Sequence, residues 1–445
     1  MTRGDSVRWW SWLLIAPFLL AGSAGAQQPD VVGRVVEGLA AAVEQRYVFP
    51  DTGRMVADHL RARLRAGAYA VSDMSQLADR LSADMKAIIG DLHLYVNYAP
   101  GAEAATGGPQ MVMRRPGDQV PPGQALQQRR ANFEIERVER LAGNVGYLLI
   151  HLLSARGNDE MYRVIDAAMS LLGRTDAMIL DVRRAPGGEP RVSDYLAGYF
   201  FGPDSVQTLN SYNRGMNSTI ERWTPRVNGT QRPDVPVYIL VGPGTASGAE
   251  DLAFIFKQTG RGILVGERTA GAGRLTRTYP IGDGFAASVP GGRTWDPRTG
   301  KEWERTGIMP DVAANGEDAL VIAHSAALER LAAASTDAAW KQSLGWAREG
   351  ILARAKPIKV ADRLLASYAG NYDLRLVRLV NGKLFYHRSA ERPGEELTPL
   401  SDTTFALGEA SRVEFVPEGS RVVAMRVRTP DGQVSTIPRT VRPST

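Results

Sequence analysis

Residues 133–315 alternate short apolar β-type runs with amphipathic helical segments, and this alternation restricts the possible folds more than any other feature of the sequence. The predicted strands are residues 145–153, 177–182, 237–241 and 262–265. The predicted helices are residues 159–172, residues 191–201 and the segment that follows Ser247. Strands joined through helices pair in parallel, and the helices cover the faces of the sheet. We therefore predict an α/β core.

Composition and periodicity divide the rest of the chain into further segments. The predicted segments are a signal peptide (1–26), a helical N-terminal domain (27–98), a Gly/Pro-rich connection (99–132), the α/β core (133–325), a helical linker (326–356) and a small antiparallel β domain (357–445). The last segment contains short β-type runs separated by Asn-Gly, Glu-Gly and Asp-Gly turn signals. Residues 90–96 alternate apolar and polar side chains, which predicts a short strand carrying His93.

The N-terminus resembles a secretory signal. Arg3 and Arg8 precede an apolar run from Trp9 to Leu20, and Ala-Gly-Ala precedes Gln27. The alternative is a membrane anchor, but the apolar run is short for one. We expect export to the periplasm or the medium, with no membrane-spanning segment in the mature chain.

The sequence contains no cysteine, which excludes disulfides, a thiol nucleophile and a thiolate-bound metal. The net charge of +5 is mild and has no dense basic run, so nucleic acid is not an expected partner. The chain has no His-Glu-x-x-His motif and no phosphate-binding loop, so we expect neither a metal nor an organic cofactor.

Ser247 lies between an apolar strand and an amphipathic helix, after a Gly-Pro-Gly turn. A nucleophile there would be close to free N–H groups and to the positive end of the helix dipole. The alternative is that Ser247 only caps the helix. Backbone N–H groups of Gly248 and of Gly187 or Gly188, which follow another strand, would supply an oxyanion hole, although the paired glycines also suit an ordinary turn.

A serine nucleophile needs a base. Ser-x-x-Lys fails because Glu250 is three residues after Ser247, and the hydrolase elbow Gly-x-Ser-x-Gly is also absent. Among the five histidines, His93 and His151 are the candidates. We expect the other three to be surface or packing residues: His59, His324 and His387.

Five motifs occur in an order and spacing that resemble the tail-specific protease superfamily. They are residues 146–150, 181–188, 245–250, 266–271 and 307–312. This group includes C-terminal processing peptidases, the tricorn core protease and the interphotoreceptor retinoid-binding protein. The resemblance spans roughly residues 30–325 and implies a ClpP/crotonase-like core, a serine endopeptidase activity, Ser247 as nucleophile, and Gly248 with Gly187–Gly188 as oxyanion donors.

The chain also departs from that family. Processing peptidases have a lysine base in the motif Thr-x-Gly-Lys-Gly, where this chain has Ala272, and there is too little sequence between His93 and Val145 for a standard PDZ domain. Other branches use an N-terminal histidine and a glutamate before Gly-x-x-Pro-Asp, which His93 and Glu304 match. In this triad His93 would take the proton of Ser247, and Glu304 would orient the imidazole.

Alternatives remain for each member of this set. Glu304 would otherwise pair with Arg305 or Arg298 at the surface. Glu250 is either a supporting residue of the site or only part of the first helical turn. His151 is the alternative base if His93 does not serve. The rival function is a catalytically inactive protein that binds peptides or lipophilic ligands on the same fold. The expected partner is a protein or peptide substrate. The sequence indicates neither which substrate is the natural one nor which oligomeric state the protein adopts.

Overall fold

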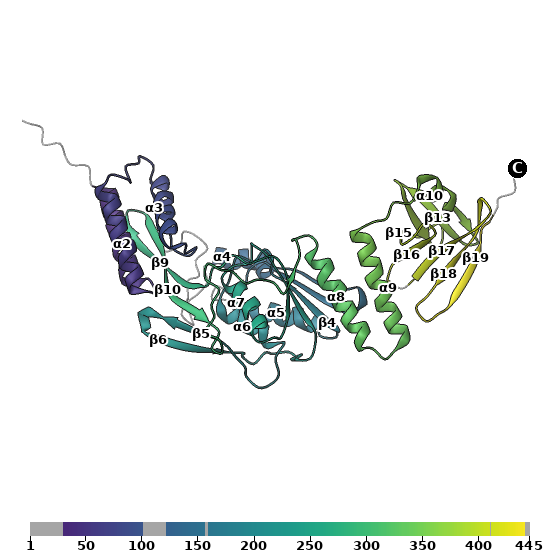
Figure 1. Cartoon of the computed structure of the whole chain (residues 1–445), viewed down its shortest axis with the longest axis horizontal. Coiled ribbons are helices and arrows are strands. Elements are labelled where there is room, and N and C mark those ends of the chain that lie inside the picture. Colours follow the sequence, from purple (N-terminus) through teal and green to yellow (C-terminus); the bar gives the residue numbers. More distant parts are fainter. Residues whose placement is uncertain (1–29, 101–121, 156–158, 410, 441–445) are drawn as a thin grey trace, which may run out of the picture.

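A computed structural model describes residues 30–100, 122–155, 159–409 and 411–440 of the chain. The molecule is elongated, with the N-terminal helices at one end, an α/β core in the middle and the C-terminal β domain at the other end (Figure 1). The predicted signal peptide and residues 101–121 of the predicted connection lie outside the described residues. Within the described part of the chain, no helix combines the length and the apolar character needed to cross a membrane.

The N-terminal region is helical, as the sequence predicts. Its helices are α1 (Val31–Arg46), α2 (Pro50–Arg65) and α3 (Met74–Ile89). Asp30 and Asp73 cap α1 and α3 by accepting backbone N–H groups, and Gly90 ends α3 in the left-handed conformation. The prediction of a strand through His93 is wrong: strand β1 (Tyr95–Tyr98) begins two residues later, and His93 lies in a turn after Gly90. The turn forms because the Asp91 carboxylate accepts the His93 N–H at 2.8 Å.

The core is a six-stranded sheet in the order β11-β8-β7-β4-β3-β2. Its strands are β2 (Ile135–Leu141), β3 (Val145–Ile150), β4 (Ala177–Asp181), β7 (Val237–Val241), β8 (Ile263–Gly266) and β11 (Val312–Ala313). All neighbours are parallel except the edge strand β2, which pairs antiparallel with β3. The predicted parallel core is therefore confirmed.

Helices cover both faces of this sheet because its central strands are apolar on both sides. Helices α5 (Glu160–Leu171), α6 (Pro190–Gly198) and α7 (Gly248–Gln258) pack on one face, with Leu180 and Ile239 in the shared core. Helix α8 (Ala319–Ala334) packs on the other face of the sheet, against side chains of the residues adjacent to Leu180 and Ile239 in their strands. The predicted single helical stretch before the β domain is two helices, because α8 ends at Ser335 and α9 (Ala338–Ala355) starts from an Asp337 cap.

A second sheet, which the sequence analysis did not predict, joins the N-terminal helices to the core. Its order is β1-β10-β5-β6, and β9 pairs with β10. Its further strands are β5 (Gln207–Asn213), β6 (Ser218–Trp223), β9 (Arg274–Gly282) and β10 (Phe285–Trp295). Strand β1 pairs antiparallel with β10, Tyr95 lying opposite Ser288, and the buried residue Phe285 packs among the N-terminal helices. This pairing brings the turn that carries His93 to the core.

The C-terminal region is a small antiparallel β domain, as predicted. Helix α10 (Asp362–Tyr368) precedes the strands β12 (Gly370–Tyr372), β13 (Arg375–Val380), β14 (Lys383–His387), β15 (Glu395–Pro399), β16 (Thr404–Leu407), β17 (Ser411–Glu418), β18 (Arg421–Arg428) and β19 (Val434–Pro438). Each strand pairs with the next, and a bridge from Tyr372 to Arg439 brings the two edges together. Stacked Tyr368 and Phe415 lie among the apolar side chains that fill the interior.

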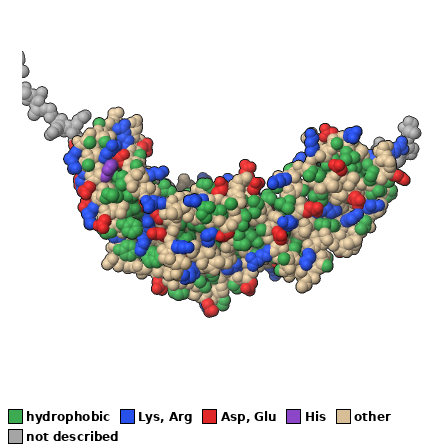
Figure 2. Space-filling view, in the orientation of Figure 1, with side chains coloured by type: hydrophobic (Ala, Val, Ile, Leu, Met, Phe, Trp, Pro, Cys, Tyr) green, Lys and Arg blue, Asp and Glu red, His purple; other side chains and the backbone are tan. Residues whose placement is uncertain are grey.

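The surface carries mixed charge. On the face drawn in Figure 2, basic and acidic side chains are interspersed, and the outline is concave between the N-terminal region and the C-terminal β domain. This distribution agrees with the mild net charge of +5.

Candidate active site

Ser247 lies at the junction of β7 and α7, where it is the N-cap residue of the helix. The preceding turn is fixed by Thr245, whose hydroxyl donates to the Val182 carbonyl at 2.8 Å and accepts the Gly242 N–H at 3.0 Å. Ser247 has φ 49° and ψ −122°. A non-glycine residue in such a conformation is strained by about 1–3 kcal/mol and is kept there by its surroundings. The sharp turn places Ser247 at the carboxyl end of a central strand.

The paired glycines after β4 lie directly against this serine. A Cβ atom on Gly187 would approach the Ser247 Cβ to 3.0 Å, and one on Gly248 would approach the Gly188 carbonyl oxygen to 2.5 Å. Gly187 and Gly188 also have φ near +147°, which side chains rarely adopt. The hydroxyl of Ser193 in α6 donates to the Gly248 carbonyl at 2.7 Å, so the two loops are held together. Glycine is required here for close backbone approach.

Glu250 connects Ser247 to the loop of residues 269–273. Its Oε2 accepts the Ser247 N–H at 3.0 Å and the Ala272 N–H at 2.7 Å, and its Oε1 accepts the Gly271 N–H at 2.8 Å and the Thr269 hydroxyl. The side chain is fully buried. Burial raises the pKa of Glu250, while these four hydrogen bonds oppose the increase. Glu250 therefore positions both the serine and the loop.

The next amide of the same loop binds Glu304. The Gly273 N–H donates to Glu304 Oε2 at 2.7 Å, and the guanidinium Nε of Arg274 lies 4.0 Å from that oxygen. Burial is the main cause that raises the pKa of Glu304 to about 7, and the nearby Asp91 carboxylate adds to it. Among the described residues, Glu304 Oε1 has no hydrogen-bond partner although it is buried. Consecutive amides thus hold two carboxylates, Glu250 and Glu304.

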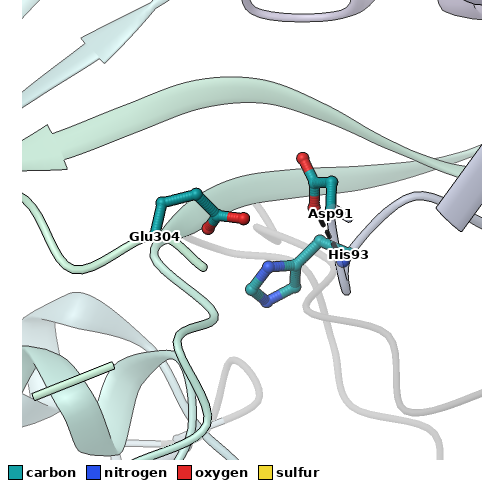
Figure 3. Close-up of side chains that lie close together, drawn as sticks. All are labelled: Asp91, His93 and Glu304. Atoms are coloured by element: carbon teal, nitrogen blue, oxygen red, sulfur yellow. Dashed lines mark hydrogen bonds between the residues drawn. The ribbon is translucent and has the colours of Figure 1, made fainter. Parts of the chain in front are cut away.

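His93 lies beside Glu304, and both approach Asp91. Ligand-type atoms of the three side chains lie within 4.8 Å of one another, and Figure 3 shows the Glu304 carboxylate pointing toward the other two. Asp91 accepts the Tyr47 hydroxyl at 2.9 Å. Burial lowers the pKa of His93, Asp91 opposes this shift and Arg274 adds to it, so the surroundings favour the neutral imidazole.

Asp91 was missed as a site residue by the sequence analysis. The only signal for it was its position two residues before a candidate histidine, where an aspartate often accepts the later N–H and forms a turn. Its second role, as a charge beside Glu304, depends on tertiary structure and leaves no pattern in the local sequence.

Arg305 fastens the Glu304 segment to the end of α3. Its guanidinium donates to the Ile89 carbonyl at 3.1 Å, and its stem lies against Gly90. This hydrogen bond joins residues that are 216 positions apart in the sequence. Because Gly90 immediately precedes the turn with Asp91 and His93, the bond keeps the two halves of the cluster together.

No hydrogen bond joins Ser247 to His93 in the described part of the chain. The hydrogen-bonded connection from the serine passes through Glu250 to the loop of residues 269–273 and on to Glu304, which adjoins His93. The methyl side chain of Ala272 is buried within this loop and has no group that takes up a proton.

The other candidates lie elsewhere. His151, just after β3, contacts the Glu136 carboxylate through Nε2 and is not part of the cluster with Glu304. His324 is buried and bonds the Ala142 carbonyl at 2.8 Å, which is a packing role. Glu304 does not pair with Arg298, which binds Asp296 instead.

These features define a class: an α/β protein with a serine-hydrolase type of site, in which a strained serine adjoins a glycine loop and a half-buried histidine adjoins a buried carboxylate. Residues 144–314 match the sequence model of peptidase family S41. Residues 29–133 match the model described as the N-terminal domain of Peptidase_S41 in eukaryotic IRBP. Both the N-terminal region and the α/β core therefore match models of peptidase family S41, in agreement with the resemblance that the order of the motifs predicts.

Its relatives include processing proteases. The chain is 31% identical over 170 residues to a carboxyl-terminal-processing protease of Synechocystis sp., a match that covers 38% of this chain and 37% of that protein. It is 34% identical over 134 residues to the chloroplastic carboxyl-terminal-processing peptidase 3 of Arabidopsis thaliana, covering 30% and 25%. The matches thus span between a quarter and little more than a third of the length of these relatives. The solved photosystem II D1 C-terminal processing protease aligns with 64% of this chain and 94% of its own, at 16% identity and a TM-score of 0.42.

Proposed function

We propose that the chain is an exported serine endopeptidase that hydrolyses peptide bonds of protein or peptide substrates through an acyl-enzyme on Ser247. The observation that carries the proposal is the joining of Ser247 to the His93–Glu304 pair through Glu250 and the loop of residues 269–273. His93 comes from the N-terminal region and Glu304 from the core, so only the folded chain assembles the set.

In this mechanism neutral His93 takes the hydroxyl proton as Ser247 attacks the carbonyl carbon. The imidazolium then gives the proton to the leaving amine, and a water attacks the acyl-enzyme with the same base. N–H groups of Gly248 and of Gly187 or Gly188 hold the oxyanion. Glu304 accepts the Nδ1–H of His93; both atoms lack other partners in the described part of the chain, which supports this pairing.

The proposal requires a histidine because Ala272 occupies the position of the lysine base of the processing peptidases. The lowered pKa of His93 suits a base that must be neutral before it acts. His93, which lies outside the loop, takes the proton-accepting role that the lysine has in those peptidases. The backbone N–H groups of the loop bind the carboxylates of Glu250 and Glu304.

The proposal extends to organisation and location. The α/β peptidase core spans residues 133–325, the N-terminal domain residues 27–98, and residues 326–356 link the core to the β domain at 357–445, which modulates access or binds a partner. Residues 1–26 direct export, so the mature protein acts in the periplasm or outside the cell.

The test is proteolysis by the purified mature chain. An unfolded protein and a set of fluorogenic peptides, each with a free or an amidated carboxyl terminus, are incubated with wild type and with Ser247→Ala. Cleavage by wild type alone supports a peptidase, and a preference for the free terminus supports processing near the carboxyl end. Saturable peptide binding that is equal in both proteins, with no cleavage, would favour the binding protein instead.

A further inference from the structure

We propose that Asp91, His93 and Glu304 form a binding site for one divalent transition-metal ion, of which Zn²⁺ is the best example, and that the bound ion switches off the peptidase. The binding half is independent of the proposed function. The inhibitory half rests on it, because it assigns the role of base to His93.

The donor set suits such an ion. One imidazole nitrogen and two carboxylate oxygens are ligands that Zn²⁺ accepts, with water completing a tetrahedron, whereas Ca²⁺ and Mg²⁺ prefer oxygen alone. The three candidate ligand atoms lie within 4.8 Å of one another. Ligand bonds of about 2.0–2.2 Å put tetrahedral ligand atoms roughly 3.4 Å apart. Side-chain rotations that move the ligand atoms by about an ångström would therefore complete the site.

Two ligand atoms are buried and unpartnered among the described residues. The Glu304 side chain is 4% exposed, its Oε1 has no hydrogen-bond partner, and Figure 3 shows the carboxylate directed at Asp91 and His93. His93 Nδ1 is the second such atom. Buried polar atoms without partners are rare and costly. A metal ion would satisfy both atoms at once.

The charges around the cluster also favour a cation. Asp91 and Glu304 raise the local negative charge, and Glu302 adds a third carboxylate close by. The guanidinium of Arg274 bonds Glu302 at 2.7 Å and lies 4.0 Å from Glu304, and that of Arg293 lies 3.9 Å from Glu302. With the three acids ionised and His93 neutral, these groups and the two guanidinium groups sum to −1, so a net negative charge remains to attract a cation. The neighbouring Tyr47 is neutral and holds Asp91 in place through its hydroxyl.

Metal binding and base catalysis exclude each other here. A metal ion on Nδ1 leaves the only ring proton on Nε2, so the imidazole has no lone pair with which to accept the serine proton. Binding through Nε2 occupies the lone pair directly. In either case the Glu304 carboxylate is also withdrawn from the imidazole, and the same ion cannot be bound while the triad works.

The binding test uses the full mature chain with Ser247→Ala, which removes self-cleavage and leaves all three proposed ligands. After dialysis against a chelator, Zn²⁺ is titrated by calorimetry, with Mg²⁺ as the comparison ion. We expect one Zn²⁺ per chain and no heat with Mg²⁺. Adding Asp91→Asn or Glu304→Gln weakens the Zn²⁺ affinity by at least about tenfold.

A matched control is His151→Ala in the same background, because His151 and Glu136 form a histidine–carboxylate contact outside the proposed metal site. We expect His151→Ala to leave the high-affinity binding of Zn²⁺ unchanged. Thermal unfolding with and without Zn²⁺ shows that each variant folds and gives a second readout: Zn²⁺ raises Tm in Ser247→Ala but not after Asp91→Asn is added. Affinity unaffected by Asp91→Asn and Glu304→Gln, or lost with His151→Ala, overturns the site.

The inhibitory half is tested on the active chain. Zn²⁺ inhibits cleavage with a midpoint equal to the dissociation constant measured by calorimetry, and a chelator restores full activity. Metal binding without inhibition would refute the inhibitory role of the ion, while the proposed metal-binding site would stand. An absence of any peptidase activity refutes the proposed function, while the calorimetry still decides the metal site.

Discussion

The N–H of Ser247 donates to Glu250 Oε2 at 3.0 Å, and the same oxygen accepts the Ala272 N–H at 2.7 Å. One buried carboxylate thus fixes the strained serine and the loop that leads to Glu304. Four donors converge on Glu250, so both of its oxygens must act as acceptors.

Glu250→Gln should therefore harm both stability and activity. Its amide nitrogen would face N–H donors, and each buried donor left unpaired costs about 1–3 kcal/mol. We expect a lower free energy of unfolding by denaturant titration and a large loss of cleavage rate. The exposed Glu317→Gln is the matched control and should change neither. A Glu250→Gln protein with wild-type stability and rate would contradict the positioning role.

Glu304→Gln should stabilise the folded chain in a pH-dependent way. The pKa of Glu304 is raised from 4.5 unfolded to about 7 folded, so the stability present below pH 4.5 is lost as the pH rises to about 7. Glutamine mimics the neutral acid and escapes this loss. The gain in unfolding free energy is near zero at pH 4.5 and reaches up to about 3 kcal/mol at pH 8. The exposed Glu267→Gln shows no such trend. A gain that is the same at both pH values would mean that folding does not raise the pKa of Glu304.

Gly187→Ala should reduce the reaction rate more than it reduces stability. The added Cβ lies 3.0 Å from the Ser247 Cβ, at a φ of +147°, so the loop must move away from the serine. Because a displacement of this kind misplaces the oxyanion donors, we expect kcat to fall by about 10²-fold or more. Gly202→Ala, where a Cβ meets no atom within 4 Å, keeps wild-type kcat. Equal kcat for both variants would exclude the loop from catalysis.

Arg222→Met should unfold or strongly destabilise the chain. Arg222, on β6, binds Asp194 of α6 at 2.9 Å and Asp251 of α7 at 2.7 Å, and all three side chains are buried. Removing the cation leaves two buried carboxylates without compensation, which costs about 3–5 kcal/mol. Thermal unfolding measures the effect, and the exposed Arg65→Met serves as control. A fall in Tm no larger than that of the control would show that the ion pairs contribute little.

The sequence allowed the parallel core, the helical N-terminal region and the β domain to be predicted, because each has a strong apolar period or clear turn residues. It did not reveal β9 and β10, whose residues are mixed in polarity and whose pairing with β1 joins segments almost two hundred residues apart. The same limit applies to the site. Ser247 was visible at a strand–helix junction, but Asp91 was not, since its place beside Glu304 depends on the second sheet and on the Arg305 anchor.

The most direct test of the central claim is covalent labelling of the purified mature chain with a fluorophosphonate, which reacts only with an activated serine. We predict labelling of wild type, none of Ser247→Ala, strongly reduced labelling of His93→Ala, and normal labelling of the control His151→Ala. Absence of labelling in wild type, or undiminished labelling of His93→Ala, would contradict a Ser247 nucleophile activated by His93.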